Sequence, residues 1–238
     1  MIKKKFITMV AAVLFLVGIS TAVGIKTFNV FNEKGQNKEP LIPKCTVIID
    51  AGHGGFDPGK VGVNNALEKD INLSIALKLK SLLEQNDIRI IMTRETDEGL
   101  YEESDSNKKN ADLRKRVEII NSSDAVIAVS IHQNSFPEES SKGAQVFYHS
   151  KSPEGKILAE IIQEQIKETI GDGNHRLAKS NESYYMLKKT ENPLVIVECG
   201  FLSNWKESEL LVDDTYQARM AWAIHLGIMN YINTYVYE

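Results

Sequence analysis

Residues 47–60, VIIDAGHGGFDPGK, run from an apolar segment directly into a histidine that is surrounded by glycines. The apolar part has the composition of a buried β-strand. Two kinds of site begin in this way, a metal site and a phosphate-binding loop. The rest of the sequence has to decide between them.

Further strand-like runs follow, and helical periodicity fills much of the space between them. The strand-like runs are residues 46–50, 88–93, 125–131, 144–149 and 194–201, and several are too uniformly apolar for a sheet with one wet face. Apolar residues share one helical face in three segments: Ile71, Ile75, Leu79 and Leu82; Leu158, Ile162, Ile166 and Ile170; and Ala218, Ala221, Trp222, Ile228, Met229 and Ile232. A shorter helix is expected over residues 111–123. This alternation predicts a single α/β domain with a largely parallel central sheet flanked by helices, and functional residues at the carboxyl ends of the strands.

The N-terminal part of the chain predicts export. Residues 1–25 consist of three lysines near the start followed by a long uncharged apolar run, which is typical of a signal peptide or a membrane anchor. Residues 26–44 are polar and contain Gly35, Pro40 and Pro43, so they are expected to be a linker. The net charge of −4 provides no basic surface for nucleic acid. We therefore expect a domain at residues 45–238 that acts outside the cytoplasm and is tied to the membrane, at least initially, by its N-terminal segment.

The phosphate-loop interpretation fails on its neighbouring residues. Residues 54–60 match the first part of the pattern G-x-x-x-x-G-K. Val61 then stands where a serine or threonine would hold magnesium, and Asp57 would bring a carboxylate toward the phosphates. The next residues do not look like the start of a helix. We therefore treat the match as chance.

A metal site requires ligands from other strand ends. His53 lies just beyond its strand, and His132 is expected to end another strand, directly after the apolar run of residues 125–131. Two histidines so placed in a parallel sheet can face each other across one end of it. The three other histidines are weaker candidates, because they follow a strand, lie in a polar loop or fall on the apolar face of the last helix: His149, His175 and His225.

Two glutamates are candidates for the remaining roles at such a site. A catalytic zinc takes three protein ligands, and Glu68 begins the helix after the opening loop, on the same sheet edge as His53. An acidic residue in a first helical turn also complements the helix dipole, and spacing alone favours that structural role. Glu198 ends an apolar strand, where an unpaired carboxylate is costly. It could act as a general base beside a metal, or it could pair with Arg94 or Arg116.

Four motifs in order carry a resemblance to a known family. VIIDAGHGG, LEKDINL, VSIHQN and VIVECGFLSN look like the zinc-dependent N-acetylmuramoyl-L-alanine amidases often called type 3, over roughly residues 45–235. The resemblance implies Zn²⁺ on His53, Glu68 and His132, with Glu198 as the catalytic base. It also implies that peptidoglycan is the substrate and that the amide between N-acetylmuramic acid and L-alanine is cleaved. Arg94 and Arg116 are expected to serve structure rather than bind a substrate carboxylate.

A narrower resemblance rests on architecture. The segment from residue 143 to 193 is short, and the chain ends soon after the last expected helix, so no added wall-binding domain or zinc-blocking helix is expected. This minimal form is similar to the spore-cortex and germination-specific amidases that help to form muramic δ-lactam during sporulation. An exported hydrolase of this kind needs control, and an activating partner protein that stabilises zinc binding is one hypothesis.

Two other function classes stay open at this point. A zinc peptidase that cuts the stem or cross-bridge peptides would need the same metal chemistry, and a peptidoglycan-binding module would have lost catalysis. A cysteine peptidase is less favoured, because Cys199 follows Glu198 in a strand and should face away from the site. Cys45 begins one strand and Cys199 ends another, too far apart for a disulfide, so both are expected to be free, mostly buried thiols.

Overall fold

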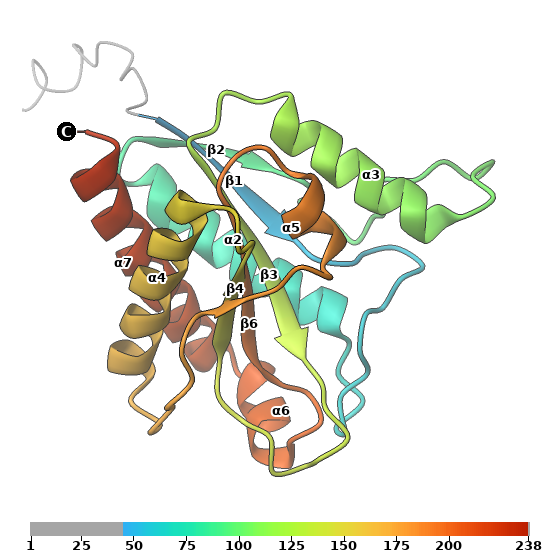
Figure 1. Ribbon diagram of the computed structural model, residues 1–238. Coiled ribbons are helices and arrows are strands. Elements are labelled where there is room, and N and C mark those ends of the chain that lie inside the picture. The colour runs from blue at the N-terminus through green and yellow to red at the C-terminus, as the bar shows by residue number, and fades with distance from the viewer. Residues whose placement is uncertain (1–44, 238) are drawn as a thin grey trace, which may run out of the picture. The chain divides into compact units, whose positions relative to one another are not determined.

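The computed structural model describes residues 45–237 (Figure 1). The predicted export segment at residues 1–25 and the predicted linker at residues 26–44 lie outside the described residues. Within residues 45–237, no helix has the length and apolar character needed to cross a membrane.

A six-stranded sheet in the order β2-β1-β3-β6-β4-β5 forms the centre of the domain. The strands are β1 (Cys45–Ala51), β2 (Ile88–Met92), β3 (Ile127–Asn134), β4 (Gln145–Tyr148), β5 (Lys179–Ser180) and β6 (Leu194–Phe201). Strands β2, β1, β3 and β6 are parallel, whereas β4 runs antiparallel to β6 and carries β5 at the edge. The predicted single α/β domain with a largely parallel sheet is confirmed.

Helices cover both faces of the sheet (Figure 1). One layer contains α2 (Glu68–Glu84), α4 (Pro153–Ile170) and α7 (Asp214–Tyr235), and the other contains α3 (Lys108–Asn121) and the short helix α5 (Tyr185–Lys189). Another short helix, α6 (Trp205–Leu211), follows β6. The three long periodic segments are confirmed as helices. Helices α5 and α6 were not predicted, because five and seven residues are too few to show a helical period.

The alternation of side chains along the strands separates two cores. Val47 and Ile49 pack with α2, α4 and α7, whereas Ile48 between them packs with residues of α3 and α5. Because both faces are buried, the strands need uniformly apolar runs, as the sequence shows. Burying one such side chain contributes about 1.5–3 kcal/mol, so the two cores fix the register of the strands and with it the positions of the polar residues at their ends.

The two cysteines occupy different environments, and both are free. Cys199 is buried with the core under α2, α4 and α7, on the opposite face of β6 from Ile196. Glu198 therefore lies on the α3 and α5 side, and Cys199 faces away from it, as predicted. Burial raises the pKa of the Cys199 thiol well above its usual range, so it is not an activated nucleophile. Cys45 is only half-buried, less than the prediction of mostly buried thiols for both.

Candidate metal and catalytic site

The polar residues at the carboxyl ends of β1 and β3 meet helix α2 in one cluster. His53, Glu68 and His132 each offer one ligand atom, and these atoms all lie within 4.8 Å of one another. His53 Nε2 is 3.2 Å from Glu68 Oε1, and His132 Nδ1 is 2.9 Å from the same oxygen. The two imidazole rings are nearly perpendicular, with centroids 5.0 Å apart. The sequence prediction that these three residues converge is therefore correct in geometry.

The loop that carries His53 passes very close to the side chains of His132 and Glu68. A Cβ atom added to Gly52 would lie 2.3 Å from atoms of the His132 ring. One added to Gly59 would lie 2.6 Å from Glu68 Oε2, and Gly59 has a φ of +70°. His53 itself has a φ of 62°, in the left-handed region that non-glycine residues seldom adopt. Glycine is thus required at positions 52 and 59 so that the two histidines and Glu68 can meet.

The same loop caps helix α2. Leu67 at the N-cap position provides no side-chain hydrogen bond. The backbone N–H groups of Glu68 and Lys69 instead donate to the carbonyl oxygens of Lys60 and Pro58. These bonds satisfy two N–H groups that the start of a helix leaves unpaired. They also tie Glu68 to the loop that follows His53, so both sides of the cluster are fixed together.

Glu68 is not merely a surface residue that complements the helix dipole. The residue is 2% exposed, and its carboxylate accepts hydrogen bonds from the backbone N–H groups of Lys60 (2.8 Å) and Gln133 (3.1 Å). Burial alone would raise the pKa of Glu68, but the hydrogen bonds from His132 and His53 outweigh it and lower the pKa overall. Glu68 is therefore a buried carboxylate that stays ionised.

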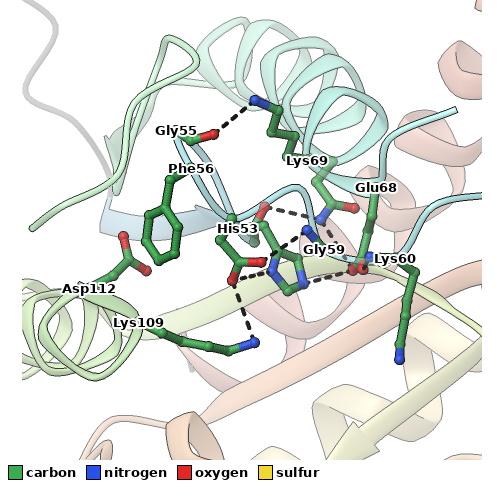
Figure 2. A network of polar contacts seen from close by, with 12 residues as sticks. His53, Gly55, Phe56, Gly59, Lys60, Glu68, Lys69, Lys109 and Asp112 are labelled. Carbon is green, nitrogen blue, oxygen red and sulfur yellow. Dashed lines mark hydrogen bonds and ion pairs between the residues drawn. The ribbon is translucent and has the colours of Figure 1, made fainter. Parts of the chain in front are cut away.

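Asp57 orients His53 and was not predicted from the sequence. Its Oδ2 lies 2.9 Å from His53 Nδ1, which leaves Nε2 of that ring toward Glu68 (Figure 2). Burial would lower the pKa of His53, but the hydrogen bonds to Asp57 and Glu68 raise it to about 9. A metal ion bound at the same nitrogen would replace that proton. The only sequence signal for Asp57 was its place four residues after His53 in the glycine-rich loop.

These residues fit a zinc ion. Two imidazoles and one carboxylate form a known donor set of catalytic zinc sites, which keep a fourth position open. A histidine ligand whose other nitrogen is hydrogen-bonded to a carboxylate is the usual arrangement around such a metal. His53 with Asp57 has that arrangement.

Glu198 lies beside the cluster because of the strand register. His132 in β3 is paired directly with Glu198 in β6, and both strands continue two to three residues beyond these positions rather than ending at them. Glu198 is 7% exposed, and burial raises its pKa to about 7. Tyr184 Oη is 3.4 Å from Glu198 Oε1, whereas Oε2 is buried and has no hydrogen-bond partner among the described residues.

Arg94 and Arg116 support the loop and do not pair with Glu198. Arg94 donates to the carbonyl oxygens of Ala51, Gly52, Lys69 and Thr96. Arg116 is 2% exposed, pairs with Asp50 at 2.6 Å and Asp112 at 2.6 Å, and donates to the carbonyl oxygen of His53 at 2.6 Å. The expected structural role of both arginines is confirmed, and the salt-bridge alternative for Glu198 is not found within residues 45–237.

Replacing Arg116 with methionine is expected to lower the free energy of unfolding by about 3–5 kcal/mol, because Asp50 would be left buried without its charged partner. Arg89→Met is the matched control: this arginine is 56% exposed and 3.7 Å from Asp124, and such surface pairs contribute about 0–1 kcal/mol. Urea unfolding of both variants measures the difference. Equal, small effects would mean that the buried network does not stabilise the loop.

A cleft of about 450 Å³ opens at the cluster. It is lined by His53, Asp57, Gly59, Lys60, Glu68, Lys109, Leu113, His132, Gln133, Asn134, Ser135, Tyr184, Tyr185, Met186, Ile196 and Glu198. The other histidines lie elsewhere, and His225 is buried on α7, stacked against Trp222. The cleft therefore contains every residue predicted from the sequence as a ligand or as the base.

Comparison with known proteins places the chain. The model of a family described as N-acetylmuramoyl-L-alanine amidase matches residues 47–230. A germination-specific N-acetylmuramoyl-L-alanine amidase of Bacillus subtilis is 38% identical over 195 residues, which cover 81% of each chain. The CwlD amidase from Clostridioides difficile, solved in complex with the GerS lipoprotein, has a TM-score of 0.77 and 45% identity over 80% of this chain and 99% of that chain. An N-acetylmuramoyl-L-alanine amidase from Clostridium difficile 630 has a TM-score of 0.72 and 29% identity over 81% of this chain and 99% of that chain. This protein belongs to the N-acetylmuramoyl-L-alanine amidase family.

Proposed function

We propose that the protein is a zinc-dependent hydrolase that cleaves the amide between the lactyl group of N-acetylmuramic acid and the L-alanine of the peptidoglycan stem. In this proposal His53, Glu68 and His132 hold the zinc ion, and Glu198 is the general base. One observation carries it: two histidines and two buried glutamates converge in one cleft of a chain that belongs to this family.

The chain's own residues supply the proton transfers. Zinc, when bound, supplies Lewis acidity that favours ionisation of water and polarises the substrate carbonyl group. Glu198 takes a proton from the attacking water at Oε2, the oxygen without a partner among the described residues. The new C–O bond forms at the lactyl carbonyl carbon, the C–N bond breaks, and Glu198 returns the proton to the departing alanine nitrogen. The products are a lactyl carboxylate and a free stem peptide.

Tyr184 holds the other oxygen of the base. Its ring packs edge-on against Phe147, with centroids 5.6 Å apart, and its hydroxyl meets Glu198 Oε1. Tyr184→Phe keeps the ring and removes the hydrogen bond, so we expect kcat to fall by about threefold to tenfold with KM and zinc content unchanged. Tyr185→Phe is the matched control in the same cleft. A change in KM alone would show that Tyr184 binds substrate and does not position the base.

Mass spectrometry of digested peptidoglycan tests the reaction. The purified protein is incubated with peptidoglycan and either zinc or a chelator. Free stem peptides that start at L-alanine, with peptide-free muramic acid, and only in the presence of zinc, are the expected products. Fragments cut within the stem would instead indicate a zinc peptidase. Intact peptidoglycan with a stoichiometric zinc content would indicate a binding module without catalysis.

The cellular part of the proposal concerns spore cortex maturation outside the cytoplasm. It is supported by the 38% identity to the germination-specific amidase of Bacillus subtilis and by the apolar segment at residues 1–25. Cortex peptidoglycan from cells that lack the protein is expected to contain less muramic δ-lactam. An unchanged lactam content would contradict the cortex role and leave the amidase chemistry intact.

Control by a partner protein is the last part of the proposal. The CwlD amidase from Clostridioides difficile was solved with the GerS lipoprotein, and a partner of that kind would control zinc binding here. Purified protein should then take up little zinc until the partner is added. Full zinc content and full activity without any partner would contradict this part.

A further inference from the structure

Only two lysine or arginine side chains line the cleft as described, and they are Lys60 and Lys109. The two arginines near the cluster are not available to a substrate, because their donors are used by backbone carbonyl groups and by Asp50 and Asp112. Any recognition of a negatively charged substrate group by a permanent cation in this cleft therefore depends on the two lysines.

Lys60 is fixed at its backbone and free at its tip. Its backbone N–H donates to Glu68 Oε2 at 2.8 Å, which places the residue beside the cluster. Its side chain is exposed, and among the described residues its ammonium group has no hydrogen bond or ion pair. Figure 2 shows this side chain extending away from Glu68 rather than into the network.

Lys109 approaches from the other side of the cluster, on the first turn of α3 (Figure 2). Its ammonium group is 3.6 Å from Asp57 Oδ2, the same oxygen that is 2.9 Å from His53 Nδ1. The Lys109 side chain is 61% exposed. A long, solvent-exposed ion pair to an oxygen that is already shared contributes little, so Lys109 can exchange this contact for another carboxylate.

The acidic groups next to the two lysines are held mainly by other partners, apart from the long contact between Asp57 and Lys109. Asp57 is paired with His53, and Glu68 accepts from both histidines and two backbone N–H groups. Each acidic side chain next to a lysine is thus already engaged. Lys60 and Lys109 are thus the cleft cations that can turn to an anionic ligand, because Asp57 and Glu68 are held by other partners.

We propose that Lys60 and Lys109 form a carboxylate-binding subsite that recognises the acidic groups of the stem peptide. The subsite rests on the proposed function, because that function supplies a peptide substrate with free carboxylates. It makes the protein selective for stems whose carboxylates are free over stems in which they are amidated. Lysine suits this role, since its flexible ammonium group can follow a mobile carboxylate as a point charge.

The test uses two synthetic N-acetylmuramoyl peptides that differ only in charge, one with free carboxylates and one with the same groups as amides. Binding to the full-length protein is measured by calorimetry in a Glu198→Gln background, so that slow hydrolysis does not disturb the titration. Lys60→Met with Lys109→Met is the test variant. Lys115→Met is the control, because this lysine of α3 pairs with Glu118 and does not line the cleft.

The double variant is expected to bind the acidic peptide roughly tenfold more weakly, about threefold for each exposed contact, and the amidated peptide equally well. The protein that retains both lysines should also bind the acidic peptide more weakly as salt is added. Equal loss for both peptides, or no loss for either, would overturn the subsite. Calorimetry measures binding without turnover, so its result is independent of the digestion experiment. Failure to cleave peptidoglycan would refute the amidase function. Failure to distinguish the two peptides in the titration would refute the subsite.

Discussion

Glu198→Gln is expected to bind zinc as the unsubstituted protein does and to lower kcat by about 10²- to 10⁴-fold, the usual contribution of general acid–base catalysis. The amide has nearly the shape of the carboxylate and can still accept from Tyr184, so the cleft should keep its form. It cannot take a proton from water at neutral pH. Zinc content by elemental analysis and release of stem peptides by mass spectrometry give the two readouts.

Glu182→Gln provides the control for this substitution, because Glu182 is exposed and its side chain bonds, within residues 45–237, only to Ser150. It should change neither readout. A Glu198→Gln protein with nearly full activity would remove Glu198 from the mechanism. A loss of zinc in the same variant would instead make Glu198 part of the metal site, and the catalytic base would have to be sought elsewhere in the cleft.

His132→Ala and His53→Ala are each expected to abolish stoichiometric zinc binding and, with it, activity. Removing one of three protein ligands should weaken zinc by more than the roughly 10- to 100-fold that loss of a supporting hydrogen bond costs. Asp57→Asn should cause only this smaller loss of zinc affinity, because it weakens the hydrogen bond to His53 Nδ1 and leaves all three ligands in place. Competition with a chelator of known affinity ranks the three variants in one experiment.

His149→Ala controls for the loss of a histidine outside the cleft and should retain zinc. Far-ultraviolet circular dichroism should show the same helix content for every variant, so that unfolding is not mistaken for loss of a ligand. If either His53→Ala or His132→Ala keeps one zinc per chain, that histidine is not a ligand. If Asp57→Asn loses as much affinity as His53→Ala, Asp57 does more than orient the ring.

The regular elements that set the fold were predictable because each leaves a repeated pattern. Strands β1, β3 and β6 are buried on both faces, which demands unbroken apolar runs, and α2, α4 and α7 each show an apolar face at the helical period. The position of His53 just beyond β1 followed from the same runs, whereas β3 continues two residues past His132, which was expected to end that strand. Helices α5 and α6 could not be predicted, because elements of five and seven residues show no detectable repeat. The antiparallel direction of β4 could not be predicted either, because strand direction depends on pairing with β6.

The sequence by itself determined the α/β class and the two histidines at one sheet edge, since the local pattern of apolar residues indicates which segments are strands and in which direction each leads. Only the tertiary structure decided which residues surround those histidines. The pairing of His132 with Glu198 is a matter of register between strands 66 positions apart in sequence. The burial of Glu68, the contact of Asp57 with His53 and the approach of Tyr184 to Glu198 depend on packing between distant segments. A residue's neighbours across a fold are fixed by the packing of the two cores, which no single stretch of sequence contains.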